Sequence, residues 1–225
     1  MNPEFWQSRW QEGRIGFHKS EVNPLLKAYF STLNVAKGGR ILVPLSGKSL
    51  DMAWLTQQGY EVIGIELVES AVEEFFAEQG ITPTVTQASN NADIKRYQGQ
   101  LSGQTIELWV ADIFALTSED VGQIDAVYDR AALIALPPDT RPKYCEHILN
   151  ISDNAPQLLV TIHYDQSQKD GPPFSVSLEQ VRQYYSDTYK LTELEDNPSI
   201  LNANAALSVT EHVWLLTPST ANNNP

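Results

Sequence analysis

Five short apolar segments alternate with helical segments between residues 41 and 165, and this alternation limits the fold more than any other feature of the sequence. The apolar segments are residues 41–45, 61–66, 105–112, 124–129 and 157–165. Apolar runs of this length, bounded by glycine or polar residues, are typical of strands that are buried on both faces. Because helices separate them, such strands pair in parallel through right-handed crossovers. The pattern predicts an α/β fold with a doubly wound, mostly parallel sheet.

The two ends of the chain extend this core. Residues 3–12 and 22–36 have helical patterns, so we expect two helices before the first strand. Residues 188–194 and 208–216 have strand patterns with no helical pattern assigned between them. We expect them to form an antiparallel pair at the end of the sheet, which brings the sheet to seven strands.

The length of 225 residues suits one domain with a full core. We expect residues 1–218 to form this single domain and residues 219–225 to be a disordered tail. Residues 82–104 are polar and contain two glycines, and we interpret them as an insertion with a small hairpin.

Charge and cysteine content exclude several classes of function. The net charge of −13 opposes binding to nucleic acid or to an anionic membrane, since both require a basic surface. The lone Cys145 cannot form an internal disulfide, and the first residues lack the basic and apolar segments of a secretory signal. The sequence has no apolar run of membrane-spanning length. We therefore expect a cytoplasmic protein, with no obligate protein partner evident.

Ligands of an open parallel sheet bind beyond the carboxyl ends of its strands. The turn after the first strand, PLSGKS, ends like a phosphate-binding loop, but Leu42 occupies the position of that loop's first glycine. The turn also lacks the GxGxxG pattern of dinucleotide sites. Both departures weigh against a phosphate ligand.

Glu66 lies 19 residues after Gly47, at the end of the second strand. A carboxylate there can accept hydrogen bonds from both hydroxyls of a ribose, although a solvated loop carboxylate is the alternative. A ribose site without a phosphate loop favours S-adenosylmethionine over a nicotinamide dinucleotide.

Arg130 lies at the end of the fourth strand. In so acidic a chain its commoner role is an ion pair with a nearby carboxylate. The alternative is a ligand site, because the guanidinium is a rigid cation that recognises anions and polarised rings.

Aromatic residues can wall such a site. Trp6 and Trp10 share one helical face, which more often indicates a core contact. Phe17 follows them, and Phe174 lies in the loop GPPF, where two prolines stiffen the backbone and can hold the Phe174 ring over a site. The four histidines are scattered and Cys145 has no second pair, so we expect no metal site.

Several segments together resemble the thiopurine S-methyltransferase family, in its bacterial branch. The matching segments, within a similarity that runs from about residue 4 to residue 217, are FWQSRWQEGRIGFH (5–18), PLSGKSLDMAWL (44–55), GYEVIGIELVESAVEEFF (59–76), DRAALIALPP (129–138) and GPPF (171–174). The resemblance implies a Rossmann-like class I methyltransferase fold and S-adenosyl-L-methionine as the methyl donor. It also implies methylation of small aromatic or heterocyclic thiols, and of selenium or tellurium compounds.

The resemblance further implies roles for individual residues. Those that would contact the cofactor are Trp10, Leu45, Glu66, Ile113 and Arg130, with Ile113 packed near the adenine. Phe17 would face the acceptor. Arg130 is also the candidate catalytic residue, and whether it touches the cofactor, the acceptor or both is left open.

This sequence departs from the family pattern in two places. Ser46 stands where many members have cysteine. Residues 191–210 contain no lysine or arginine, whereas vertebrate members place a second substrate-contacting arginine in the corresponding region. A small-molecule thiol methyltransferase is the leading hypothesis. The alternatives are a nicotinamide-dependent oxidoreductase and a binding module without turnover.

Overall fold

The structure of the chain is a computed structural model that describes residues 3–88, 93–198 and 208–219. Its strands are β1 (Arg40–Pro44), β2 (Glu61–Glu66), β3 (Thr84–Gln87), β4 (Lys95–Leu101), β5 (Gln104–Val110), β6 (Ala126–Arg130), β7 (Gln157–His163), β8 (Tyr189–Pro198) and β9 (Thr210–Pro218). Its α-helices are α1 (Pro3–Gln11), α2 (Pro24–Tyr29), α3 (Leu50–Gln57), α4 (Glu69–Glu78), α5 (Ser118–Val121), α6 (Arg141–Ile151) and α7 (Leu178–Tyr185).

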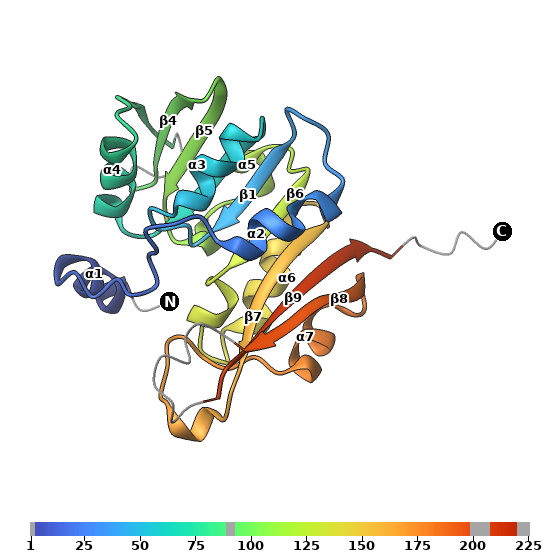
Figure 1. The fold of residues 1–225 in the computed structure, drawn as a ribbon. Coiled ribbons are helices and arrows are strands. Elements are labelled where there is room, and N and C mark those ends of the chain that lie inside the picture. The colour runs from blue at the N-terminus through green and yellow to red at the C-terminus, as the bar shows by residue number, and fades with distance from the viewer. Residues whose placement is uncertain (1–2, 89–92, 199–207, 220–225) are drawn as a thin grey trace.

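All nine strands belong to one sheet, in the order β3-β4-β5-β2-β1-β6-β7-β9-β8 (Figure 1). The five central strands, β5, β2, β1, β6 and β7, are parallel, as the sequence predicts. β8 and β9 form the predicted antiparallel pair and join the sheet through β7. The order of the strands reverses between β1 and β6, which is where a doubly wound sheet leaves a crevice.

The sheet has nine strands where seven were expected. The hairpin predicted within residues 82–104 is present as β3 and β4, and β4 pairs with β5 at the edge of the sheet. The polar sequences of these strands match their burial: all four residues of β3 are exposed, and β4 is mostly half-buried with Tyr97 as its one buried residue. A period-two apolar pattern was therefore absent, although the strands form.

Two further elements differ from expectation. The second predicted helix is shorter, because α2 gives way to a 3₁₀ turn, Phe30–Leu33, that ends at Asn34 in the left-handed region (φ 53°). Helix α7 was not assigned from the sequence; it begins with a capping box in which Ser177 and Gln180 satisfy each other's backbone N–H groups. The expected tail lies outside the described residues, apart from Ser219.

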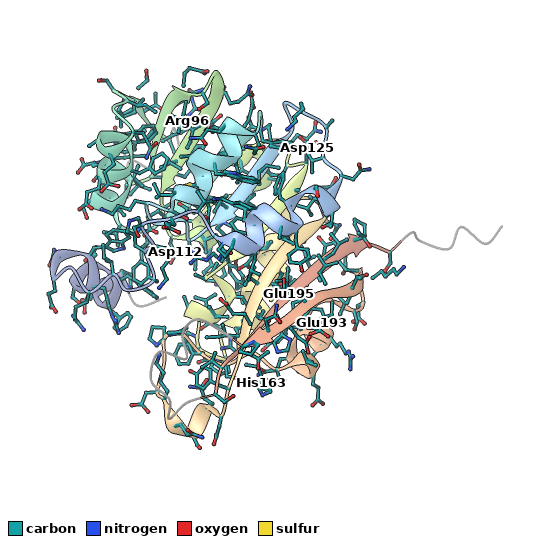
Figure 2. The ribbon with its side chains drawn as sticks, in the orientation of Figure 1. Arg96, Asp112, Asp125, His163, Glu193 and Glu195 are labelled. Atoms are coloured by element: carbon teal, nitrogen blue, oxygen red, sulfur yellow. The ribbon has the colours of Figure 1, made fainter. Side chains whose placement is uncertain are left out.

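Helices cover both faces of the sheet. Apolar residues of α2, α3 and α4 pack on one face, and those of α5, α6 and α7 pack on the other. Helix α1 lies to one side, where Trp10 packs on Val68 and Ala71 (Figure 1). Asp125, just before β6, lies in the upper part of the molecule as drawn, and His163, at the end of β7, lies in the lower part (Figure 2). The parallel strands thus run with their carboxyl ends away from Asp125.

Candidate functional site

A cavity of about 650 Å³ opens at the carboxyl ends of the central strands. Its floor includes residues from β1, β2, β6 and β7, and its roof comes from the chain between α1 and α2. Five of the six residues that the resemblance assigns to the site line this cavity: Trp10, Phe17, Leu45, Glu66 and Arg130. Ile113 does not line it. Its side chain is fully buried in the core on the α6 face of the sheet.

The tip of β1 makes an abrupt turn into the cavity. Leu45 and Gly47 both have left-handed backbone conformations, with φ of 47° and 52°. A Cβ atom on Gly47 would lie 3.2 Å from the Trp10 ring, so glycine permits both the turn and the close approach of the indole. Leu45 adopts this conformation without that freedom, and such strain is typical of functional sites.

Glu66 joins the tips of β1 and β2. Its carboxylate accepts the backbone N–H of Gly47 and that of Val68, each at 2.8 Å. The side chain is buried, and burial raises the pKa of Glu66, while hydrogen bonds from Val68, Gly47 and Leu67 oppose this shift. The interpretation as a solvated loop carboxylate is therefore wrong, because the residue is only 7% exposed.

Three aromatic side chains form one wall. Phe17 makes edge contacts with Trp6 and Trp10, with ring centroids 5.8 Å and 5.7 Å apart. All three residues also line the cavity. Trp6 and Trp10 can therefore pack against other apolar residues and still form the wall of a ligand site. The wall presents ring faces and edges where water would otherwise enter.

Arg130 lies where β6 ends, with its side chain 17% exposed and 3.5 Å from the buried carboxylate of Asp51. The following residue, Ala131, has a left-handed conformation with φ of 65°. Arg130 is thus paired with an acid, as the commoner interpretation predicts, and it also lines the cavity, so its role in binding a ligand stays a prediction.

The loop after β7 supplies Lys169, Pro172 and Pro173 to the cavity, but not Phe174. The Phe174 ring faces the guanidinium of Arg141 at 5.9 Å, and the Phe174 N–H donates to Ile134 at 2.7 Å. Arg141 is fully buried and anchors the same loop through the Ser175 carbonyl. Phe174 therefore fastens this loop to the core instead of covering the site.

Two basic side chains near the turn also line the cavity. Lys48, from the SGK turn, pairs with Glu74 at 2.8 Å and Glu78 at 2.6 Å, so it is held by α4. Burial and the nearby Lys48 ammonium lower the pKa of His18 and so favour its neutral imidazole.

Sequence reasoning missed several lining residues, above all Asp51 and Tyr128. Asp51 offered one signal, an acid inside the otherwise apolar stretch LDMAWL. Tyr128 offered another, since it lies two residues before Arg130 and so shares its face of the strand.

In the part of the chain that the structure describes, no three histidine, cysteine, aspartate or glutamate side chains gather as metal ligands would. Nor does any helix there have the length and apolar character of a membrane span.

Comparisons with known proteins agree on one family. A model of the family described as thiopurine S-methyltransferase matches residues 1–218. The thiopurine S-methyltransferase of Psychrobacter cryohalolentis is 60% identical over 216 residues, which cover 96% of this chain and 99% of the relative. That of Pseudomonas syringae pv. pisi is 43% identical over 222 residues, covering 96% and 99%.

Solved structures give the same fold class. The 1,6-didemethyltoxoflavin-N1-methyltransferase of Burkholderia thailandensis, solved with S-adenosylhomocysteine, has a TM-score of 0.62 at 14% identity and covers 96% of this chain and 87% of its own. A TehB-like S-adenosylmethionine-dependent methyltransferase from Corynebacterium glutamicum has a TM-score of 0.54 at 11% identity, covering 96% and 98%. The nicotinamide alternative is not favoured, since these proteins are methyltransferases. The chain belongs to the thiopurine S-methyltransferase family.

Proposed function

We propose that this protein transfers the methyl group of S-adenosyl-L-methionine to the sulfur of a small aromatic or heterocyclic thiol. The observation that carries the proposal is the convergence of Trp10, Leu45, Glu66, Arg130 and Phe17 on one cavity at the strand reversal. Family membership supports the same reaction. Selenium or tellurium compounds are further candidate acceptors.

The donor end of the cavity would lie over β1 and β2. A carboxylate has about four lone-pair sites, so Glu66 keeps acceptor capacity for ribose hydroxyls beyond the backbone N–H groups it already binds. The Gly47 turn lets the Trp10 ring pack closely over the tip of β1, at the edge of the cavity that both residues line. These residues fit the donor. Ile113 begins the 3₁₀ turn Ile113–Ala115, and its side chain points into the core. It would therefore support the adenine from behind this turn.

The acceptor end would lie over β7 to β9, where Lys169, Glu195 and Glu211 line the cavity. Arg130, on β6, lies between the two ends because β6 separates β1 from β7 in the sheet. The donor supplies a sulfonium methyl group that a thiolate displaces in line. Arg130 would orient the anionic or polarised acceptor, while the aromatic wall excludes water and its ring faces suit a cation.

The test is direct. Incubation of the protein with S-adenosylmethionine and a panel of aromatic thiols should give S-methyl products, measured by mass spectrometry. Calorimetry should show binding of S-adenosylhomocysteine and none of NADH. Absence of product with every thiol, together with absence of S-adenosylhomocysteine binding, would refute the proposal. Binding without any product would instead indicate a module without turnover.

We also infer that residues 1–218 act as one methyltransferase domain, which the single continuous sheet and the span of the family match support. A reducing cytoplasm suits the lone Cys145, whose thiol is buried. The acidic net charge argues against nucleic acid as a partner.

A further inference from the structure

Asp51 holds three parts of the cavity together with a single carboxylate. It lies in the first turn of α3 and is only 2% exposed. One oxygen accepts the backbone N–H of Asn23 at 2.8 Å, and the other accepts the Tyr128 hydroxyl at 3.0 Å. The second oxygen also lies 3.5 Å from a terminal nitrogen of Arg130.

These partners come from different walls of the same cavity. Asn23 belongs to the roof, where its side chain caps α2 by accepting the Leu25 N–H at 2.8 Å. Tyr128 and Arg130 project from the same face of β6 because they are two residues apart on a strand. Asp51 therefore fixes the entry to α2 and the direction of the Arg130 side chain at once.

The ion pair between Asp51 and Arg130 also determines the net charge that a bound acceptor meets. Arg130 lies at the end of β6, beside the strand reversal, and its Asp51 partner is almost fully buried, so solvent screens this ion pair little. Lys48 is neutralised by two carboxylates of its own. A bound acceptor thus meets an Arg130 whose charge is offset by Asp51, beside an end of the cavity that Lys169, Glu195 and Glu211 also line.

We propose that Asp51 is a positioning residue that sets acceptor selectivity, because it aims the Arg130 guanidinium and offsets its attraction for acceptors that carry a second anionic group. This inference rests on the proposed function and goes beyond it. We therefore expect the pocket to bind a carboxylate-bearing thiol more weakly than it would if Arg130 had no carboxylate partner.

The experiment measures binding, so that turnover is not required. Thiophenol and 4-mercaptobenzoate are titrated by calorimetry into protein saturated with S-adenosylhomocysteine, which carries no methyl group to transfer. Asp51→Asn keeps groups that can bond Asn23 and Tyr128 but removes the charge facing Arg130. We expect the ratio of 4-mercaptobenzoate affinity to thiophenol affinity to rise roughly tenfold, as one uncompensated charge a few ångströms away predicts. An unchanged ratio would overturn the inference.

Two matched variants control for structure. Glu107→Gln removes another buried carboxylate that faces arginines, Arg40 and Arg96 at 3.6 Å each, but it lies outside the cavity and should leave the ratio unchanged. Asp51→Glu keeps the charge and should restore a ratio near that of the wild type, even if both affinities fall. Equal shifts in Asp51→Asn and Glu107→Gln would show a general effect of lost charge and contradict the selectivity role.

A double variant covers the case in which Asp51→Asn alone does not fold. Asp51→Asn with Arg130→Gln removes both charges, so its ratio should match the wild type within about twofold. Arg130→Gln alone leaves Asp51 unpaired and should lower the ratio about tenfold. If the double variant matched Arg130→Gln alone, the charge of Asp51 would be irrelevant to selectivity. Failure of the proposed function is distinguishable, since it would appear as wild-type binding of both thiols without methylation.

Discussion

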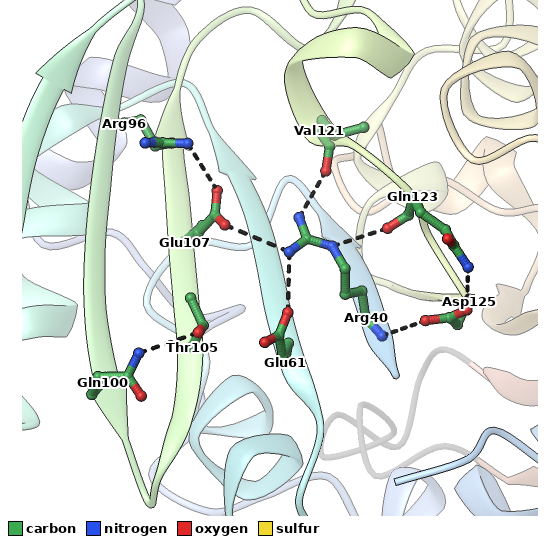
Figure 3. Close-up of polar contacts among 9 residues, drawn as sticks. All are labelled: Arg40, Glu61, Arg96, Gln100, Thr105, Glu107, Val121, Gln123 and Asp125. Carbon is green, nitrogen blue, oxygen red and sulfur yellow. Dashed lines mark hydrogen bonds and ion pairs between the residues drawn. The ribbon is translucent and has the colours of Figure 1, made fainter. Parts of the chain in front are cut away.

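Arg40 and Arg130 lie at opposite ends of two neighbouring parallel strands, β1 and β6. They differ in how many of their N–H donors have partners. Arg40, at the start of β1, contacts Glu61 at 3.1 Å and Glu107 at 3.6 Å, and it also donates to two backbone carbonyls, those of Val121 and Gln123 (Figure 3). Arg130, at the end of β6, has the Asp51 pair, and within residues 3–88, 93–198 and 208–219 it makes no second ion pair.

The difference distinguishes an arginine whose contacts stabilise the fold from one that can bind a ligand. An arginine has five N–H donors on three nitrogen atoms, and each of the three nitrogens of Arg40 has a partner on β2, β5 or the segment before β6. Arg130 keeps donors in reserve, and they face a cavity. Buried polar groups are normally hydrogen-bonded. An arginine that keeps unused N–H donors facing a cavity is therefore the better candidate for binding a ligand.

Replacement of Arg130 should give the largest effect. Arg130→Gln removes the guanidinium from the centre of the cavity, and we expect kcat/KM for thiol methylation to fall about 100-fold, equivalent to roughly 3 kcal/mol. Unfolding in urea should also report a loss, of about 1 to 3 kcal/mol, because the buried Asp51 carboxylate loses its cationic partner. A variant that lost stability but kept its kcat/KM would reverse the assignment of the two arginines.

Arg40→Gln is the matching substitution at the start of β1. It leaves Glu107, which is 7% exposed, with Arg96 as its remaining partner and also removes the contact with Glu61, and we expect the free energy of unfolding to fall by about 2 kcal/mol. Affinity for S-adenosylhomocysteine, measured on the folded protein, should not change. Weakened binding at unchanged stability would contradict the structural role of Arg40.

Asp129 offers a test within β6 itself, because it neighbours Arg130 but points to the opposite face of the strand. Its carboxylate accepts the Tyr144 hydroxyl at 2.7 Å, and burial raises the pKa of Asp129 from 3.8 to about 6. The folded state therefore holds this proton more tightly than the unfolded chain, and the contribution to stability is lost as pH rises through about 6.

We expect the wild type to lose about 2 to 3 kcal/mol of unfolding free energy from this group between about pH 4 and pH 7, relative to Asp129→Asn. Urea unfolding of both proteins across that range isolates the effect. Parallel curves for the two proteins would show that Asp129 does not titrate in this way.

Ala131 should give the smallest effect. Its φ of 65° is unfavourable for a residue with a Cβ atom. Ala131→Gly should relieve this strain and raise the free energy of unfolding by about 0.5 kcal/mol, after the greater entropy of glycine in the unfolded chain is subtracted. Thermal unfolding measures the change, and a lower melting temperature would argue that the strain is not significant.

The sequence was most informative where one strand determines the position of one residue. Leu45, Glu66 and Arg130 follow buried parallel strands, so their place at the carboxyl edge is a consequence of the strand pattern. The Asp51 contacts to Asn23 and Tyr128 join residues 28 and 77 positions apart, and no local pattern specifies them.

Elsewhere local rules were insufficient for a different reason. The polar strands β3 and β4 owe their place to pairing with β5 and not to an apolar face of their own. Phe174 was expected to cover the site, but the buried Arg141, which no pattern marked, draws the ring toward the core. Tertiary contacts decided both outcomes.

The central claim is that the methyl donor binds at the tips of β1 and β2, and a pair of glutamates tests it most directly. Glu66→Gln and Glu107→Gln each neutralise a carboxylate that is 7% exposed, one inside the cavity and one remote from it. Calorimetry with S-adenosylhomocysteine should show affinity reduced about tenfold or more for Glu66→Gln and unchanged for Glu107→Gln. Wild-type affinity in Glu66→Gln would contradict the claim.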